Sequence, residues 1–296
     1  MSFIDFARAH GVEIGDLYPA EKIRRCGTTE KPRSKNGAYF WDGRRGWVFA
    51  WDGEARVQWY DDPNATPWTE AEKQAWKAKR HAAHTLQDST NRAAADKAAQ
   101  MLRSTVPGPH DYLIRKRLVE AQGLVLPDGA LLVPMRNLFT NELQGAQIIR
   151  WQPDEMKWEK KMLPGMKARG AVLRLGSTRA TETILCEGYA TGLSIELAAR
   201  QMRLNASVLV CFSDVNMVHV AELIKTGRRY VFADHDKPAK RTGRRAGEEA
   251  ARQTGLPYCM SPVEGEDAND MHARAGLLPV CSLLMQARAQ RVEAVP

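Results

Sequence analysis

Residues 182–188 read ETILCEG, and residues 228–236 read RRYVFADHD. Each is a short apolar run that ends in acidic residues, as expected of a buried strand that stops at a polar edge. Two more apolar runs, SVLVCF at 207–212 and PYCMS at 257–261, have the same character. Helix-like segments separate these runs at 190–202, 218–227 and 246–255. Strands that alternate with helices predict an α/β domain with a parallel sheet and helices on both faces.

Acidic residues follow three of the predicted strands. The first strand runs into Glu187, the third into Asp234 and Asp236, and the loop after the fourth carries Asp267 and Asp270. The carboxyl ends of parallel strands share one edge of a sheet, so we expect these side chains to converge. Carboxylates so close would raise one another's pKa unless a divalent cation neutralised them. Acidic residues often simply mark strand ends, but this ordered set predicts a site for Mg²⁺ or Mn²⁺.

The order of these motifs resembles the Toprim domain, which is shared by bacterial and phage primases, type IA and type II topoisomerases and certain nucleases. The segments ILCEGYATGLSI, YVFADHD and GEDANDMH are most similar to the Toprim primases of phages and plasmids. A weaker resemblance extends upstream to the subdomain that precedes Toprim in those primases. It is carried by HDYLIRKRL at 110–118, LLVPMRN and LQGAQIIRW within 131–151, and KKMLPG and KARGAVLRLG within 160–176.

The resemblance implies a DNA primase that makes short RNA primers on a single-stranded DNA template from ribonucleoside triphosphates. It implies magnesium-dependent nucleotidyl transfer in phage or plasmid replication. Glu187 would be the general acid/base or a carboxylate beside the metal, and Asp234 and Asp236 would hold the metal. Asp267 would complete the site, with Asp270 as a neighbour. Lys161 and Lys167 match the upstream basic motif, which implies contact with nucleotide phosphates or the primer–template.

The charge of the chain favours a polyanionic partner. The sequence has 43 Lys and Arg against 35 Asp and Glu, a net charge of +8. Several basic residues follow the Asp234–Asp236 motif directly, where they could contact phosphates or could equally form a solvated loop. The further candidates for nucleotide or nucleic-acid binding are Arg136, Arg150, Lys160, Lys237, Lys240, Arg241, Arg244 and Arg245.

The rest of the chain divides by composition into five predicted segments. These are an N-terminal β region at 1–66, a long charged helix within 67–106, a small mixed α+β subdomain at 107–180, the Toprim-like domain at 181–276, and a C-terminal helix or tail at 277–296. Thr69 and Glu72 have the spacing of a capping box, which predicts a helix that starts there and runs to about Arg103.

Aromatic residues are concentrated in the N-terminal region. Trp41, Trp47, Phe49, Trp51 and Trp59 fall in segments that alternate with period two, as strands do. Such a stripe could stack the bases of single-stranded DNA. Aromatic stripes more often form a core, and the core is what we expect here.

Several absences limit the predicted cofactors and partners. Cys26 is the only cysteine in the first 185 residues, so we expect no zinc module there, and the five cysteines look like reduced core thiols. No G-x-x-x-x-G-K-[ST] loop occurs, so a helicase would be a separate partner. No apolar run approaches the ~20 residues of a membrane span. We expect a cytoplasmic protein, in a bacterium or a phage-infected host, with no membrane partner.

Three other functions can be weighed from the sequence. A Toprim nuclease would use the same carboxylates to cut phosphodiesters, but the upstream primase-like region disfavours it. A topoisomerase is disfavoured further, because no segment offers a domain with a nucleophilic tyrosine. A non-catalytic module would keep the acidic residues as scaffold and use its basic surface only to bind DNA or a replication protein.

Overall fold

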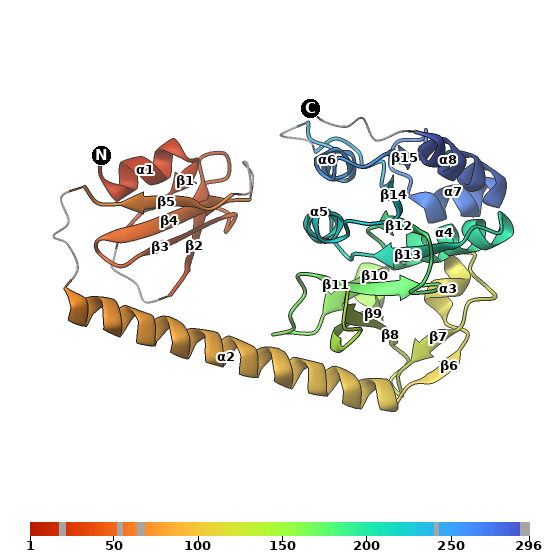
Figure 1. The fold of residues 1–296 in the computed structure, drawn as a ribbon, viewed down its shortest axis with the longest axis horizontal. Coiled ribbons are helices and arrows are strands. Elements are labelled where there is room, and N and C mark those ends of the chain that lie inside the picture. Colours follow the sequence, from red (N-terminus) through yellow and green to blue (C-terminus); the bar gives the residue numbers. More distant parts are fainter. Residues whose placement is uncertain (18–21, 52–55, 64–68, 240–242, 291–296) are drawn as a thin grey trace. The chain divides into compact units, whose positions relative to one another are not determined.

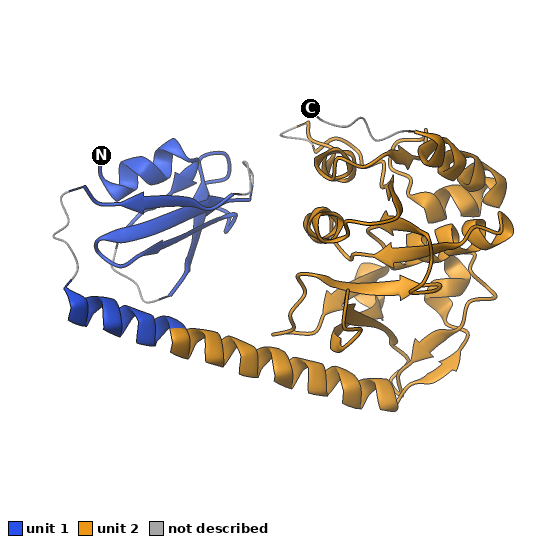
Figure 2. Cartoon of the chain, viewed as in Figure 1, with its two compact units in different colours: residues 1–80 blue, residues 81–296 orange. Residues whose placement is uncertain are grey.

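The chain forms two compact units, residues 1–80 and residues 81–296 (Figure 2). A computed structural model describes residues 1–17, 22–51, 56–63, 69–239 and 243–290. Helix α2 (Glu70–Arg103) belongs in part to each unit. It begins as predicted, because the Thr69 hydroxyl accepts from the Glu72 amide at 3.2 Å and the Thr69 amide donates to the Glu72 carboxylate at 2.8 Å.

The first unit is an antiparallel sheet with one helix on it (Figure 1). The elements are α1 (Phe3–Ala9), β1 (Val12–Glu13), β2 (Arg24–Thr28), β3 (Gly37–Trp41), β4 (Arg45–Ala50) and β5 (Gln58–Asp61), with the strands paired in chain order. Phe3 of α1 stacks on Trp41 with ring centroids 4.7 Å apart, and it packs closely against Gly46. Tyr39, Val48 and Tyr60 complete this small core.

The aromatic stripe divides between the two faces of this sheet, which corrects the expectation that it is core. Trp41 is buried under α1, as expected. Strand alternation directs Trp47 and Phe49 to the opposite face, since Val48 between them is fully buried in the core. Trp51 and Trp59 keep 48% and 71% of their surface exposed. The periodicity identified the strands, but it could not say which face a single short helix would cover.

The second unit is built on one ten-stranded sheet. The order is β10-β9-β8-β11-β13-β12-β14-β15, with β7 also paired to β8 and β6 paired to β7. Its strands are β6 (Val106–Gly108), β7 (Gly123–Val125), β8 (Leu131–Asn137), β9 (Leu143–Gln152), β10 (Lys157–Met162), β11 (Ala171–Leu175), β12 (Glu182–Cys186), β13 (Ala206–Val210), β14 (Arg228–Ala233) and β15 (Tyr258–Met260). The strands from β6 to β11 pair antiparallel, and β13, β12, β14 and β15 pair parallel. Strand β11 pairs with both β8 and β13, so it joins the two halves.

Helices cover both faces of the parallel part, as the sequence predicted (Figure 1). They are α4 (Tyr189–Gln201), α5 (Asp214–Leu223), α6 (Ala246–Gln253), α7 (Ala268–Ala275) and α8 (Leu277–Ala289), and the short α3 (Asp111–Arg115) lies upstream. Helix α5 starts four residues before the predicted segment, because Ser213 caps it by accepting from the Asn216 amide at 3.2 Å. Among the described residues no helix is long and apolar enough to cross a membrane.

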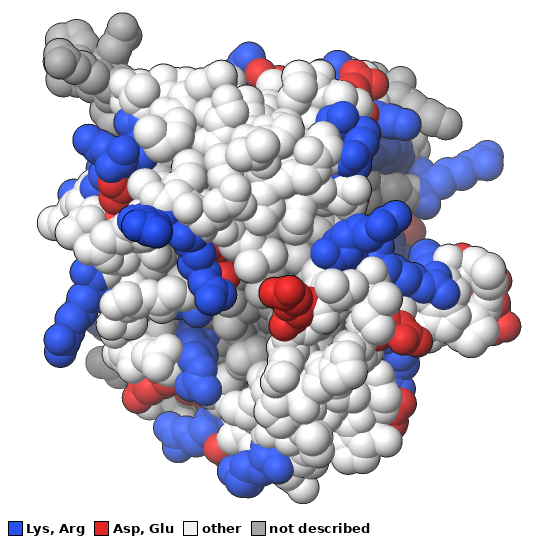
Figure 3. All heavy atoms as spheres, turned by 90° about the vertical axis from the view of Figure 1, so that its right-hand side faces the viewer, with Lys and Arg blue, Asp and Glu red and all other residues white. Residues whose placement is uncertain are grey.

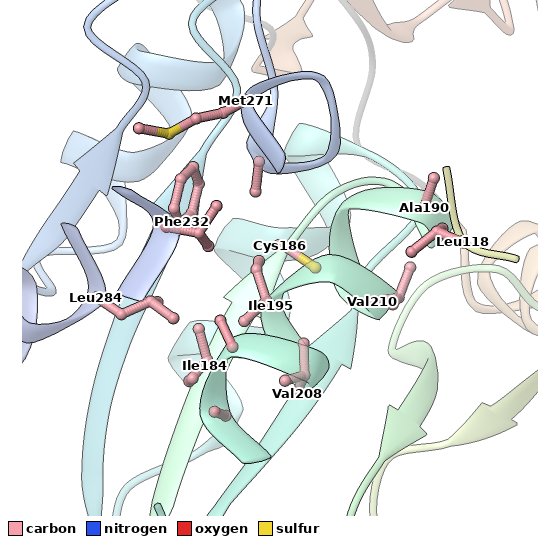
Figure 4. Packing of buried hydrophobic residues seen from close by; sticks show 14 of the residues in the cluster. Leu118, Ile184, Cys186, Ala190, Ile195, Val208, Val210, Phe232, Met271 and Leu284 are labelled. Atoms are coloured by element: carbon pink, nitrogen blue, oxygen red, sulfur yellow. The ribbon is translucent and has the colours of Figure 1, made fainter. Parts of the chain in front are cut away.

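Strand alternation separates two cores in the second unit. Ile184 and Cys186 point to the side of α4, α7 and α8, where Ile195, Phe232 and Leu284 also pack (Figure 4). The intervening residues point the other way: Leu185, Leu209 and Val231 pack with Met217 and Val220 of α5 and Ala251 of α6. A third cluster buries Ala98 of α2 in the second unit, where it packs with residues of β8 and β9. The parallel strands are therefore fixed on both faces, and their ends are held in place.

Candidate active site at the carboxyl edge of the parallel strands

The four parallel strands all end at one edge of the sheet, and each is followed by an acidic residue. Glu187 follows β12, Asp214 lies beyond β13, Asp234 and Asp236 follow β14, and Asp267 lies beyond β15. The charges of these groups act on one another's pKa, which places the side chains near each other. The structure therefore places four of the five carboxylates that the sequence singled out at this edge, and adds Asp214.

Asp234 is strongly desolvated. Burial, and then the negative charges of Asp267 and Glu187, raise its pKa well above the usual range. Its Oδ1 atom is buried and has no hydrogen-bond partner among the described residues. A buried oxygen without a donor is unfavourable in an otherwise folded protein. This oxygen is therefore suited to a bound cation.

Glu187 is held at the centre of the edge by its backbone and its strand. Its carbonyl accepts from the Phe212 amide at 2.9 Å, which ties the end of β12 to the turn after β13. Burial, and then the charges of Asp214 and Asp236, raise the pKa of Glu187 to about 7. A carboxyl group with this pKa can take up or release a proton at neutral pH.

Asp236 is fixed by the start of helix α6. Its Oδ2 accepts from the Gly247 amide at 2.8 Å, and Arg245 donates to its carbonyl at 2.9 Å. A Cβ atom on Gly247 would lie 2.4 Å from the carbonyl oxygen of Asp234, so only glycine permits this close approach. The Asp-x-Asp motif and α6 therefore form one tightly packed unit.

Asp267 and Asp270 differ in their contacts. Asp267 caps α7, since its Oδ1 accepts from the Asp270 amide at 2.8 Å, and its Oδ2 accepts from the Thr191 hydroxyl at 3.0 Å. Asp270 forms an ion pair with Lys116 at 2.9 Å. Asp267 therefore faces α4 and the other carboxylates, whereas Asp270 is engaged with the upstream part of the unit.

Asp214 was missed by the sequence analysis. It follows a strained turn, because Phe212 is a bulky residue with a φ of 65°. Asn216, in the first turn of α5, stabilises this turn: its side chain accepts from the Gly170 amide and donates to the carbonyls of Ala171 and Cys211. The same rule that identified Glu187, an acidic residue after a parallel strand, would have identified Asp214.

Lys160 and Lys116 bring positive charge to the acidic edge. Lys160 on β10 keeps access to solvent, while loss of hydration, and then the charge of Lys116, lower its pKa. Asp267, Asp234 and Glu187 act on Lys160 in the opposite direction, so it lies near all three. Burial is the largest single influence on the pKa of Lys116 and lowers it, but the hydrogen bond to Asp270 and the charges of Asp267 and Asp270 together outweigh burial and raise this pKa. Lys116 lies in the HDYLIRKRL segment and was not singled out.

Several of the other predicted basic residues pair with protein groups outside the acidic edge, although Arg245 also donates to the Asp236 carbonyl. Lys161 pairs with Glu159, Arg150 with Asp128, Arg244 with Glu249 and Arg245 with Glu264, while Arg136 donates to the carbonyl of Asn141. Lys167 is exposed between β10 and β11, and the exposed Lys237 packs along Gly265. Lys240 and Arg241 lie outside the described residues. On the face shown in Figure 3, Lys and Arg side chains stand in several separate groups with uncharged surface between them.

The carboxylates fit a hard cation by their chemistry. The donors are carboxylate oxygens, and Asp234 Oδ1 is buried without a partner. Within the part of the chain that the structure describes, no three His, Cys, Asp or Glu side chains lie together so that they could hold a metal ion. Mg²⁺ commonly binds one or two protein carboxylates and takes its other oxygens from water and phosphates.

The family comparison agrees with this geometry. A family model for the Toprim domain matches residues 182–277. This part of the chain is a Toprim domain. The match begins at the first residue of β12 and ends at the start of α8, so it includes Glu187, Asp214, Asp234, Asp236 and Asp267. The Toprim domain accordingly spans the parallel strands with their acidic edge.

Two solved structures are similar to larger parts of the chain than the Toprim domain. One is from a structure of the bacteriophage T7 lagging-strand DNA polymerase interacting with primase domains of two gp4 subunits bound to an RNA/DNA hybrid and dTTP. The two chains are 16% identical, and the match covers 54% of this chain and 77% of that chain with a TM-score of 0.35. The other is the Aquifex aeolicus primase, with its zinc-binding and RNA polymerase domains. The two chains are 13% identical, and the match covers 96% of this chain and 82% of that chain with a TM-score of 0.40. The search of curated proteins found no match.

Proposed function

We propose that this chain is a DNA primase, which joins ribonucleotides into short RNA primers on single-stranded DNA by magnesium-dependent nucleotidyl transfer. The observation that carries the proposal is the buried Oδ1 of Asp234, which has no hydrogen-bond partner among the described residues and lies at a Toprim edge that also carries Glu187 and Asp267. Its natural context would be phage or plasmid replication, with a separate helicase, in the cytoplasm.

Each residue of the edge has a role in this proposal. Asp234 and Asp267 would hold Mg²⁺, with Asp236 and Asp214 beside them. When bound, the ion would neutralise negative charge on the transferred phosphoryl group and the departing pyrophosphate. Lys160 would bind the triphosphate, because it is a solvent-accessible cation next to the carboxylates.

Glu187 would act on the attacking hydroxyl. A carboxylate oxygen of Glu187 could accept the proton of the primer 3′-hydroxyl, because Glu187 lies at the end of β12 among the carboxylates of the edge. Lys116 would keep Asp270 in its ion pair and hold α3 against the Toprim domain, where Asn269 also donates to the Lys116 carbonyl at 2.9 Å. Transfer of this kind depends on alignment and charge rather than on covalent help from the protein.

Primer synthesis on a single strand tests the proposal. The purified full-length protein, single-stranded DNA, labelled ribonucleotides and Mg²⁺ should give short RNA products. Asp234→Asn and Glu187→Gln should each reduce their yield by at least ~100-fold, as expected for groups that act on the reacting atoms. Lys161→Gln is the matched control for Lys160→Gln, because Lys161 is on the same strand but pairs with Glu159. Only the Lys160 variant should raise the KM for the nucleotide.

Two other results of this experiment would indicate a different function. Shortened DNA without RNA products would indicate a Toprim nuclease. DNA binding without either product would indicate a non-catalytic module, in which the acidic edge serves only as scaffold.

A further inference from the structure

The first unit leaves one face of its sheet uncovered by its own helix. Helix α1 packs on the side of Tyr39 and Val48, which are 4% and 0% exposed. The opposite side carries Trp47, Phe49 and the exposed Trp59. Single exposed apolar residues are common on proteins, but a contiguous aromatic surface marks an interaction site.

The residues on this face lie in two cross-strand rows, the first of three aromatic side chains and the second with one aromatic side chain. Phe40, Trp47 and Trp59 lie opposite one another on β3, β4 and β5. Arg25, Ala38 and Phe49 do the same on β2, β3 and β4. The two rows are two residues apart along each strand, which corresponds to ~7 Å. Successive bases of an extended single strand can be placed on rings at such a spacing, because each base offers a flat face to stack on.

Positive charge accompanies the rings. The guanidinium of Arg25 lies 3.8 Å from the centre of the Trp51 ring, and Trp51 contacts Phe49 with ring centroids 4.4 Å apart. Arg45, on the same face, pairs with Asp61. The segment 22–36, which contains all of β2, includes six basic residues and one acidic residue: Lys22, Arg24, Arg25, Lys31, Arg33 and Lys35 against Glu30. A purely apolar partner would gain nothing from this charge, whereas a nucleic-acid backbone would.

We infer that this face binds a single strand of nucleic acid, with bases stacked on Trp51 and Trp59 and phosphates near Arg25. Stacking on rings does not read sequence, so binding should tolerate any base. Duplex DNA should bind more weakly, because its bases are already stacked and paired. The inference extends the proposed function to a second part of the chain, and its test does not require catalysis.

The test measures the affinity of the full-length protein for fluorescein-labelled (dT)20 by anisotropy, in EDTA. Trp51→Leu and Trp59→Leu should each weaken binding by ~5- to 100-fold, the usual effect of losing one stacked base. Trp59→Phe should keep affinity within about threefold of the wild type, because a phenyl ring still stacks. Arg25→Gln should weaken binding less and reduce its dependence on salt.

Matched controls separate this face from other causes. Trp76→Leu makes the same change at a tryptophan on α2 that is 37% exposed, and it should leave affinity unchanged. Circular dichroism confirms that each variant is folded. Asp234→Asn should abolish primer synthesis but not (dT)20 binding, so failure of the proposed function is distinguishable. The inference is overturned if the folded Trp51→Leu/Trp59→Leu protein binds (dT)20 as tightly as the wild type does. It is also overturned if duplex DNA binds as tightly as (dT)20, or if sedimentation shows that this face instead joins two copies of the chain.

Discussion

Asp234 lowers the stability of the metal-free protein, because a buried carboxylate lies there among others with one oxygen unpartnered. We predict that Asp234→Asn raises the free energy of unfolding in EDTA by about 1 kcal/mol, since it removes a buried charge and supplies amide donors. Urea denaturation followed by circular dichroism measures this. Mg²⁺ should raise the melting temperature of the wild type and have less effect on the variant. Equal responses to Mg²⁺ would argue against Asp234 as a ligand.

Gly247 controls the position of the Asp-x-Asp motif through sterics alone. Gly247→Ala would place a methyl group 2.4 Å from the Asp234 carbonyl oxygen. We predict a loss of about 1–3 kcal/mol in stability, typical of overpacking, together with a loss of primer synthesis. Gly108→Ala is the control, because nothing lies within 4 Å of a Cβ atom there. A Gly247→Ala protein with wild-type stability would show that the loop moves freely.

The carboxylates of the site could be predicted from the sequence, and their chemical environment could not. Glu187, Asp234, Asp236 and Asp267 follow from the position of acidic residues after strands. Which lysine faces them depends on strand alternation on β10: Lys160 lies near the acidic edge, and its neighbour Lys161 pairs with Glu159. A shift of one residue in the strand register would exchange the directions of Lys160 and Lys161. Two adjacent lysines in the sequence do not show which of them faces the carboxylates.

One buried carboxylate joins the end of helix α8 to the sheet, in addition to the apolar contacts of Leu284. Arg288 near the end of α8 donates twice to Glu182 at the start of β12, at 2.7 and 2.9 Å, and Tyr230 donates to the same group at 3.3 Å. The hydrogen bond from Arg288 is the main reason that the pKa of Glu182 is lowered. We predict that Arg288→Met costs about 2–3 kcal/mol at neutral pH, because Glu182 loses its main partner while it stays buried.

The effect of pH on this pair has a definite sign. A carboxyl group with a lowered pKa in the folded state stabilises the fold above its ordinary pKa, and that contribution is lost as the pH falls through the folded value. The difference between wild type and Arg288→Met should therefore shrink below the ordinary pKa of 4.5. Urea denaturation at neutral and acidic pH measures it. Arg200→Met is a control, because its partner Glu196 is 3.6 Å away on the same surface helix.

Elements with strong local signals were predictable, and the covered face of a sheet was not. The capping box at Thr69 located the start of α2, and apolar runs located the parallel strands. The aromatic strands of the first unit were found by their alternation. Whether Trp41 or Trp59 would be buried depended on where α1, a helix of seven residues, packs. That contact is made across the chain and leaves no local pattern.

The two units have separate cores, so they should unfold separately. The core of the first unit shares no residue with the clusters of the second. We predict that Val48→Ala, which truncates a fully buried residue of the first unit, lowers only one of two calorimetric transitions, by roughly 2 kcal/mol. Ile184→Ala should lower only the other. A single shared transition that moves with both substitutions would contradict this.

The pairing of β11 with both β8 and β13 has a consequence for anyone who shortens this protein. The boundary of the recognisable family match, residue 182, falls inside a continuous hydrogen-bonded ladder. A fragment that starts there would lose β11 and leave the edge of β13 without its pairing partner. An unpaired strand edge promotes aggregation. It would also lose Lys160, which approaches the carboxylates from β10. A fragment that keeps β13 paired and Lys160 beside the carboxylates must therefore begin well before the Toprim match.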